Sequence, residues 1–157
     1  MSLPLRSASP CIAAAMRAAS RRLTVLYDEV MAPSGLRVTQ FVILAELERR
    51  ISEPPTVSEL AEILTMERSA LGQTLRTLES DGLVALDRDQ RDARRRPVRL
   101  TQAGRKAAAR GRPYWEKAHA RFAHFYGDAD ALSKLRSTLR DIAENPALDE
   151  AFGTRRD

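Results

Sequence analysis

The sequence is poor in several residue types, and each shortage excludes a class of protein. A single cysteine, Cys11, cannot form an internal disulfide and fits a reducing compartment. Aromatic residues make up only 5% of the chain, which argues against binding single-stranded nucleic acid through exposed aromatic platforms. No apolar run is long enough to span a bilayer, and residues 1–10 lack the apolar core of a secretory signal. We therefore expect one cytoplasmic domain, without membrane contact, from the 157 residues.

Residues that carry catalysis or bind metals are also scarce. The two histidines, His119 and His124, are five residues apart in a predicted helix and point about 140° away from each other, so they do not easily share a metal. Neither a glycine-rich phosphate loop nor a serine elbow is present. Asp128 and Asp130 resemble helix-start carboxylates more than a nuclease pair. We expect no enzymatic activity, no cofactor and no metal site.

Positive charge, in contrast, is in excess. The net charge of +5 favours an anionic partner, although charge alone does not select one. The order of elements in residues 56–101 is more specific: two short helices, then two short strands joined by an arginine-rich loop. This order is typical of a winged helix-turn-helix, in which one helix enters the major groove of DNA and the loop reaches the neighbouring minor groove.

The first of these helices has a clear start. Pro54-Pro55 ends the preceding segment, and Thr56 forms a predicted capping box with Glu59. The helix then has an apolar stripe made of Val57, Leu60, Ala61 and Leu64. A turn is expected at Thr65-Met66.

The second helix, from about Glu67 to Ser80, is predicted to be the recognition helix. Leu71, Leu75 and Leu78 recur at spacings of four and three and point one way. The opposite face and its edges carry the candidate DNA contacts Arg68, Ser69, Gln73, Arg76 and Thr77, with Ser80 beside them. Such side chains suit base edges and phosphates, but an ordinary solvated face is the alternative for this helix taken alone.

The predicted hairpin follows a stop at Asp81-Gly82-Leu83. Its strands are expected at residues 83–86 and 97–100. The loop from 88 to 96 holds five arginines against two aspartates, and phosphates are the obvious partners for that imbalance. A loop that is merely solvated is the alternative. The candidate DNA contacts in this loop are Arg88, Arg91, Asp92, Arg94, Arg95 and Arg96.

The run from Leu36 to Thr101 resembles the MarR family of multiple-antibiotic-resistance-type transcription regulators. The matching segments are 36–41 (LRVTQF), 58–61 (SELA), 78–84 (LESDGLV), 92–94 (DAR) and 98–104 (VRLTQAG). The resemblance implies a cytoplasmic homodimer that reads a pseudopalindromic operator, usually as a repressor released by a small ligand or an oxidant. It implies that Arg94 enters the minor groove while Asp92 braces it. It also implies that Arg68, Ser69 and Gln73 face the major groove.

Further helices are predicted before, within and after this DNA-binding region (residues 36–101). An amphipathic helix runs through residues 12–30, and another runs from about 39 to 50 with Phe41, Leu44, Ala45 and Leu47 toward the core. A long helix capped by Thr101 reaches 125 or 126, interrupted and kinked at 111–113 by Pro113. A last helix ends before Pro146, and residues 146–157 are expected to be a loose tail, with Phe152 as its candidate anchor.

The terminal helices, residues 10–32 and 102–145, are predicted to form a dimer. Their apolar faces exceed what one small core can cover, so the surplus is expected to be buried against a second copy. A two-fold dimer would also place two recognition helices about one turn of DNA apart. The partners expected are therefore double-stranded DNA, a second copy of the chain and a small-molecule effector.

Two triggers for release from DNA are compatible with the sequence. The first is a small anionic aromatic molecule, bound in a pocket that the MarR resemblance implies between the dimer helices and the DNA-binding region. The candidate wall residues are Met16, Arg17, Ser20, Tyr27, Phe41 and Trp115, of which the apolar ones could equally be core. The second is oxidation of Cys11, which lies near a helix start, although a cysteine on an apolar stripe is more often a buried filler. An architectural protein that binds DNA without sequence preference is the rival from another class.

Overall fold

A computed structural model describes residues 10–86 and 97–153 of the chain. Helices dominate these ranges, and a two-stranded hairpin follows the fourth helix. In chain order the elements are α1 Ile12–Met31, the 3-10 turn η1 Ala32–Ser34, α2 Val38–Arg49, α3 Val57–Ile63, α4 Arg68–Ser80, β1 Val84–Leu86, β2 Val98–Leu100, α5 Gln102–Tyr126, α6 Ala129–Glu144 and α7 Pro146–Ala151.

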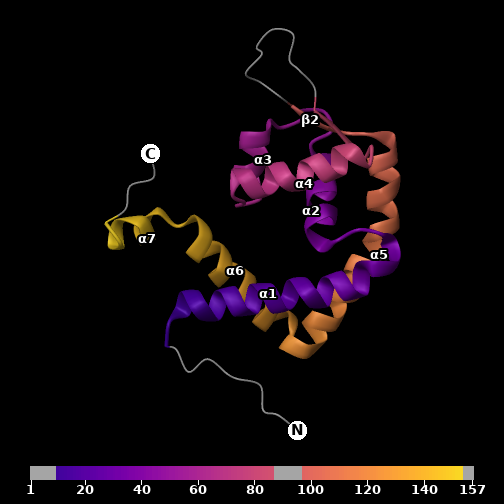
Figure 1. The fold of residues 1–157 in the computed structure, drawn as a ribbon. Helices are drawn as coiled ribbons and strands as arrows, with labels where there is room; N and C mark the ends of the chain where they lie inside the picture. Colours follow the sequence, from indigo (N-terminus) through magenta and orange to yellow (C-terminus); the bar gives the residue numbers. More distant parts are fainter. Residues whose placement is uncertain (1–9, 87–96, 154–157) are drawn as a thin grey trace.

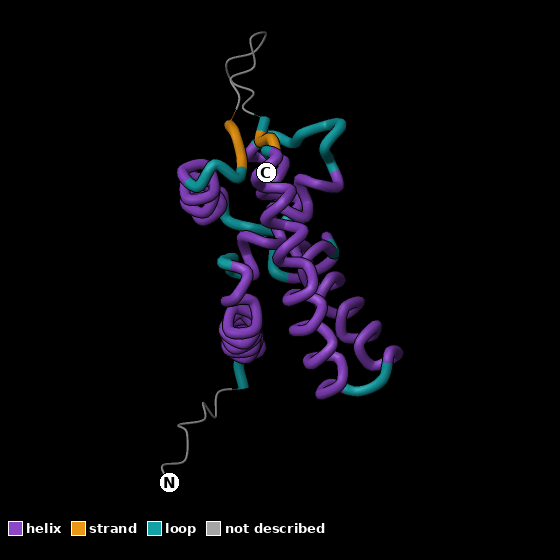
Figure 2. Tube along the Cα trace, turned by 90° about the vertical axis from the view of Figure 1, so that its right-hand side faces the viewer, coloured by secondary structure: helices purple, strands orange, loops and turns teal. Residues whose placement is uncertain are grey.

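The elements are arranged in two groups that α5 connects. Figure 1 shows α2, α3, α4 and the hairpin on one side of the molecule and α1 extended across the other side, with α6 leading away to α7. Figure 2, turned by 90°, shows the strands at the opposite end of the molecule from the start of α1. The mainly helical winged fold that the sequence predicts is confirmed.

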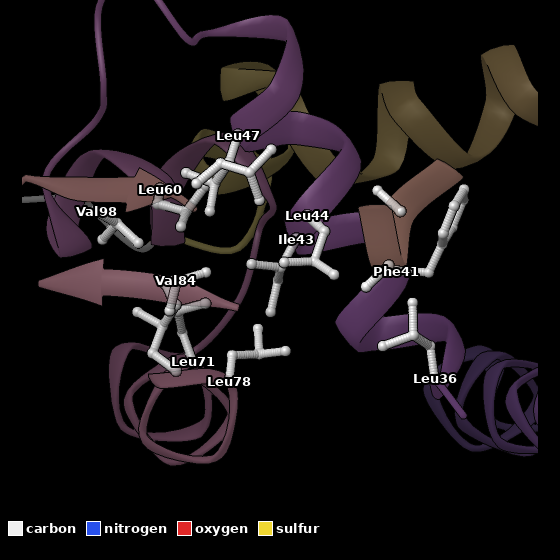
Figure 3. Close-up of a cluster of buried hydrophobic side chains, with 14 of the residues drawn as sticks. Leu36, Phe41, Ile43, Leu44, Leu47, Leu60, Leu71, Leu78, Val84 and Val98 are labelled. Carbon is white, nitrogen blue, oxygen red and sulfur yellow. The ribbon is translucent and has the colours of Figure 1, made fainter. Parts of the chain in front are cut away.

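The core lies inside the DNA-binding region. Leu71, Leu75 and Leu78 of α4 are at most 1% exposed, as their spacing predicts. Figure 3 shows side chains from α2, α3, α4 and both strands pointing toward one another in this cluster. The predicted inward residues of α2 are buried or packed against the same cluster: Phe41, Leu44, Ala45 and Leu47. Because its leucines are held inside, α4 must present its opposite face to solvent.

The ends of α3 and α4 follow the local signals in the sequence. The Thr56 amide donates to the Glu59 carboxylate at 2.7 Å, and the Glu59 amide donates to the Thr56 hydroxyl at 3.3 Å, which completes the capping box. At the end of α4, Gly82 has φ +69°. The Leu83 amide then bonds the Leu78 carbonyl at 2.8 Å, as in a Schellman motif.

The base of the hairpin is tied to both helices of the helix-turn-helix. The strands pair antiparallel, with Leu86 opposite Val98. Thr56, at the start of α3, forms an isolated bridge with Pro97. The Glu79 carboxylate, near the end of α4, accepts from the Leu86 amide at 3.4 Å. The strand positions therefore depend directly on how α3 and α4 are placed.

α5 begins in close contact with the hairpin. The Thr101 hydroxyl accepts from the Gly104 amide at 3.0 Å and lies 2.7 Å from the Gly82 carbonyl oxygen, to which it donates. A Cβ on Gly104 would lie 2.0 Å from the Leu83 carbonyl oxygen. A residue without a side chain is therefore needed for α5 to pack here.

The predicted interruption of this long helix is wrong. α5 is assigned as one α-helix from Gln102 to Tyr126, with Pro113 inside it. A proline removes one backbone donor and does not end a helix whose neighbours hold it on both sides. Gly111 is buried against Phe41 and Leu36, and Arg112 bonds Glu48 of α2 at 2.6 Å. These tertiary contacts stabilise the helix where Pro113 removes a backbone donor.

The loose tail expected for residues 146–157 is wrong for residues 146–151, which form α7. The sequence contains the signals for this helix: Pro146 stands at its first position, and the Asn145 side chain accepts from the Ala147 amide at 3.0 Å. Phe152 is 77% exposed and is not pinned to the rest of the chain.

Within residues 10–86 and 97–153, no single helix is long and apolar enough to cross a membrane. One pair of consecutive helical segments, residues 12–34 and 38–49, has the length and composition of a span only when taken together, and the pair is bent by 72°.

Candidate nucleic-acid interface and ligand cavity

The outer face of α4 carries the predicted contact residues. Arg68, Ser69, Gln73, Arg76 and Thr77 are all exposed. They lie opposite the buried leucine row, so the side chains project from a helix that the core holds rigidly. The Thr77 hydroxyl donates back to the Gln73 carbonyl at 3.4 Å, which leaves its oxygen available as an acceptor.

The start of α4 is set by a tight turn from α3. Thr65 in this turn has φ +50°, a value that a β-branched residue rarely adopts. The Met66 amide bonds the Ala61 carbonyl at 2.8 Å, and the Leu71 amide bonds the Glu67 carbonyl at 3.0 Å. The turn and the first helical bonds therefore hold Arg68 and Ser69 at the exposed N-terminus of α4, where anions are favoured.

The tip of the wing lies outside the described residues. Six predicted DNA contacts fall in it: Arg88, Arg91, Asp92, Arg94, Arg95 and Arg96. The described strands fix where this segment leaves and rejoins the fold. Arg99 of β2, which sequence reasoning did not include, is exposed between the buried Val98 and Leu100. The apolar–charged–apolar alternation of these three residues was the signal that could have found it.

A pocket of about 770 Å³, partly open to solvent and called the cavity below, lies between α1, α5 and α6 and reaches the DNA-binding region at Val38 and Thr65. Among the predicted wall residues, Met16, Ser20 and Tyr27 do line it. The remaining lining residues are Ala19, Leu23, Thr24, His119, Phe122, Leu132, Leu135, Arg136 and Leu139. The α6 members recur at helical spacing, so the amphipathic pattern of that helix could have identified them.

Three predicted wall residues do not line the cavity. Arg17 is exposed on another face of α1. Phe41 is 3% exposed in the core and stacks on Trp115, with ring centroids 5.8 Å apart. Both aromatic rings serve packing, because α5 crosses α2 at this point and the Gly111 backbone lies against Phe41.

His119 extends the Phe41–Trp115 stack to the wall of the cavity. Its ring lies parallel to that of Trp115 at 5.2 Å, with an interplanar angle of 1°. Its Nδ1 is 3.3 Å from the Tyr27 hydroxyl. Burial raises the pKa of Tyr27, so that hydroxyl keeps its proton at physiological pH. The sequence suggests only a metal-binding role for His119, which its spacing from His124 disfavours; its place in the cavity depends on a contact with a residue 92 positions away.

Cys11 immediately precedes α1 and is exposed. It is therefore not a buried filler in this chain. No group of three or more His, Cys, Asp or Glu side chains within residues 10–86 and 97–153 is placed to hold a metal ion.

The exposed polar face of α4 and the hairpin that follows this helix define the chain as a DNA-binding protein of the winged helix-turn-helix class. Residues 34–95 match the sequence model of the MarR family. The chain is 32% identical over 125 residues to the transcriptional activatory protein BadR of Rhodopseudomonas palustris, and the match covers 74% of this chain and 67% of BadR. The chain belongs to the MarR family of transcription regulators.

Solved structures give the same result. The transcriptional regulator MosR of M. tuberculosis in complex with DNA is 31% identical, with a TM-score of 0.77, and the match covers 90% of this chain and 98% of MosR. The transcriptional repressor CouR bound to p-coumaroyl-CoA is 25% identical, with a TM-score of 0.75, and the match covers 90% of this chain and 99% of CouR.

Proposed function

We propose that this protein is a homodimeric, sequence-specific transcription regulator that acts in the cytoplasm as a repressor and leaves its operator when a small organic ligand binds. It acts by binding, without catalysing a reaction. The observation that carries the proposal is the exposed polar face of α4 on a core-anchored helix, in a chain 31% identical to a regulator solved with DNA.

In the proposed complex, α4 lies in the major groove. Gln73 suits adenine and Arg76 suits guanine or a phosphate, because their side chains can make paired hydrogen bonds to base edges. Arg68 and Ser69, at the helix N-terminus, meet the backbone or adjacent bases. The wing arginines extend the contact, with Arg94 in the minor groove.

Dimerisation is proposed from the apolar side chains that the terminal helices leave exposed. Phe125 is 86% exposed at the end of α5, Ile142 is 39% exposed on α6 and Leu148 is 40% exposed on α7. Ile12 at the start of α1 is 70% exposed. Burying them against a second copy would remove this surface from water at a gain of about 25 cal/mol per Å². A two-fold axis then matches a pseudopalindromic operator.

The sign of regulation depends on where the operator lies relative to the promoter. The name of BadR describes an activator, and CouR is a repressor. We propose repression for this chain because a dimer that covers a promoter blocks transcription by its presence alone. It needs no surface that contacts the polymerase. A reporter whose expression falls when the gene is removed would contradict this part.

DNA binding is tested by fluorescence anisotropy with the DNA upstream of the gene. Gln73→Ala and Arg94→Ala are each expected to weaken binding by about 1–3 kcal/mol. Arg22→Ala is the control for Arg94→Ala, since it also removes one positive charge. Arg22 lies on the exposed face of α1, in the opposite group of elements (Figure 1). Equal affinities for all four proteins would reject the assigned contacts.

Competition separates a specific regulator from an architectural DNA-binding protein. A regulator is expected to prefer its operator over random DNA by about 10³-fold or more. An architectural protein would release the operator fragment when an equal mass of random duplex is added.

The dimer is tested by light scattering at micromolar concentration. Ile142→Arg is expected to give monomers, because it places a charge in the proposed interface. Val42→Arg is the matched control, since Val42 is also 39% exposed but lies on α2. A wild-type protein that is monomeric in this assay would overturn the proposal.

Cysteine oxidation is retained as a second trigger because Cys11 is exposed at the start of α1. Peroxide treatment of the wild type and of Cys11→Ser tests it. DNA affinity that is unaffected by peroxide in both proteins would eliminate this alternative.

A further inference from the structure

The corner between α1 and α2 joins a helix of the proposed dimer to the DNA-binding region. The chain turns here from one helix into the other (Figure 1), and residues 12–34 and 38–49 are bent by 72° relative to each other. The angle at this corner therefore contributes to how each DNA-binding region is held on the dimer.

Local hydrogen bonds determine the path of the backbone through the corner. The Ser34 hydroxyl donates to the Met31 carbonyl at 2.7 Å and accepts from the Leu36 amide at 3.2 Å. Gly35 has φ +77°, and its amide donates to the Ala32 carbonyl at 3.0 Å. These bonds shape the turn, but none of them reaches the first residue of α2.

The start of α2 is held instead by a side chain from α1. Arg37 precedes α2 in an extended conformation, and an arginine side chain has no acceptor with which to cap a helix. Asp28 lies ten residues before Val38, and its carboxylate accepts from the Val38 amide at 2.7 Å. A carboxylate suits this place because the N-terminus of a helix is its positive end. Asp28 therefore replaces the missing cap from another helix.

This bond is one of two side-chain hydrogen bonds that link α2 to the terminal helices within the described part of the chain. The other is the Arg112–Glu48 pair near the far end of α2, at 2.6 Å. The side chain of Arg112 is 49% exposed and that of Glu48 is 34% exposed, and ion pairs in contact with solvent contribute little. Asp28 and Val38 are both half-buried, so their bond is the firmer constraint on the angle between α1 and α2.

A small change in this angle is large on the scale of DNA. The 12 residues of α2 span about 18 Å. A rotation of about 10° at the start of α2 moves its far end by about 3 Å, close to the roughly 3.4 Å that one base pair occupies. α4 shares its core with α2 and moves with it. In a two-fold dimer the distance between the two recognition helices, and hence the accepted half-site spacing, changes accordingly.

We infer that Asp28 is a positioning residue for DNA recognition: by capping α2 from α1 it fixes the angle of each DNA-binding region on the dimer, and so the half-site spacing that the dimer accepts. The inference rests on the proposed dimer and on its sequence-specific binding. It gives a residue that touches no DNA a role in selecting the operator.

The test varies the spacing of the operator. The probes are the upstream fragment trimmed to the site protected in footprinting, and two copies with one base pair inserted or deleted at its centre. The wild type is expected to prefer the natural spacing. Asp28→Ala is expected to bind the natural site about tenfold more weakly, as when the competent angle is populated about one tenth of the time, and to lose most of the preference. A wild type without preference, or an Asp28→Ala variant that keeps it in full, would overturn the inference.

Three further variants separate the cap from charge and from folding. Asp28→Asn keeps an acceptor oxygen and should restore most of the preference; a variant as altered as Asp28→Ala would reject the cap as the cause. Glu29→Ala is the control, since it removes one negative charge from the next, exposed residue of α1, and its preference should match the wild type. Asp28→Glu keeps the charge but lengthens the side chain by one methylene, so it should fold and reduce the preference for the natural spacing. If Asp28→Ala does not fold, an unchanged preference in Asp28→Glu overturns the inference.

A distance measurement without DNA reads the angle directly. In a Cys11→Ser background, Ser80→Cys places a spin label at the exposed end of α4 in each protomer. Electron paramagnetic resonance then gives the distribution of distances between the two labels. Asp28→Ala should broaden this distribution, and Glu29→Ala should leave it narrow. Equal widths in the two variants would reject the positioning role.

Failure of this inference and failure of the proposed function are distinguishable. A wild-type protein that binds its operator specifically, with the same spacing preference in Asp28→Ala, would preserve the proposed function and reject the role of Asp28. A label distance that depends on Asp28, in a dimer with no affinity for its upstream DNA, would do the opposite.

Discussion

Two glycines in helices should respond in opposite directions to the same substitution. Gly72 lies inside α4, and a Cβ built there meets no atom within 4 Å. Gly104 lies in the first turn of α5, and a Cβ there would be 2.0 Å from the Leu83 carbonyl oxygen and 2.6 Å from Leu100. Sequence alone gives no reason to treat them differently, since both occupy regular helical backbone.

The magnitudes follow from these contacts. Gly72→Ala is expected to raise stability by about 0.5–1 kcal/mol, because alanine loses less backbone entropy in a helix. Gly104→Ala should lower it by about 1–3 kcal/mol, since relieving a 2.0 Å contact with backbone requires the hairpin or α5 to move. For a domain of this size each kcal/mol shifts the unfolding temperature by roughly 2–4 °C.

The assay is urea and thermal unfolding by circular dichroism, at one protein concentration because a dimer gains stability with concentration. DNA affinity adds a second readout: Gly104→Ala is expected to weaken it, because the base of the wing moves. If Gly104→Ala is as stable as Gly72→Ala, the close packing of α5 on the hairpin is not as described.

Two further changes test packing and electrostatics. Glu46 is 6% exposed and bonds Arg49 and Arg50; burial raises its pKa, but these arginines outweigh that effect and lower it. The stability that this carboxylate contributes is therefore full above its ordinary pKa of about 4.3. It is lost as the pH falls through the lower pKa of the folded protein. Glu46→Gln should therefore reduce the loss of stability that the protein shows at acidic pH. Pro113→Ala restores a donor inside α5 and should raise stability by about 1 kcal/mol in thermal unfolding; a decrease would mean that the proline shapes the helix.

Local signals in the sequence were sufficient for the DNA-binding region. The capping box at Thr56, the leucine row of α4 and the stop at Gly82 each depend on steps of three to five residues along the chain. Such patterns determine where a helix begins, which face is buried and where it ends. The exposure of Gln73 and Arg76 follows directly from them.

The cavity could be predicted only in part, because its wall comes from helices distant in the sequence. Of the α1 residues expected in the pocket that the family resemblance implies, Met16, Ser20 and Tyr27 line it, but Arg17 faces elsewhere. Whether Trp115 or His119 reaches the cavity depends on how α5 rotates against α1 and α2. That rotation is set by the close approach of Gly111 to Phe41, a tertiary contact.

The turn before α4 connects the cavity to the DNA-binding surface. Thr65 lines the cavity and stands three residues before α4 begins. Its φ of +50° is unique among the described non-glycine residues, and this conformation costs about 1–2 kcal/mol for a residue with a side chain. Thr65→Gly removes that cost and Thr65→Asn lowers it, so both should unfold at higher temperature than the wild type, with Thr65→Ala between them and the wild type. A ligand that moves this turn can release its strain, so the ligand-induced loss of DNA affinity should be smaller in Thr65→Gly. An unfolding temperature unchanged from the wild type in Thr65→Gly and Thr65→Asn would mean that the turn stores no strain.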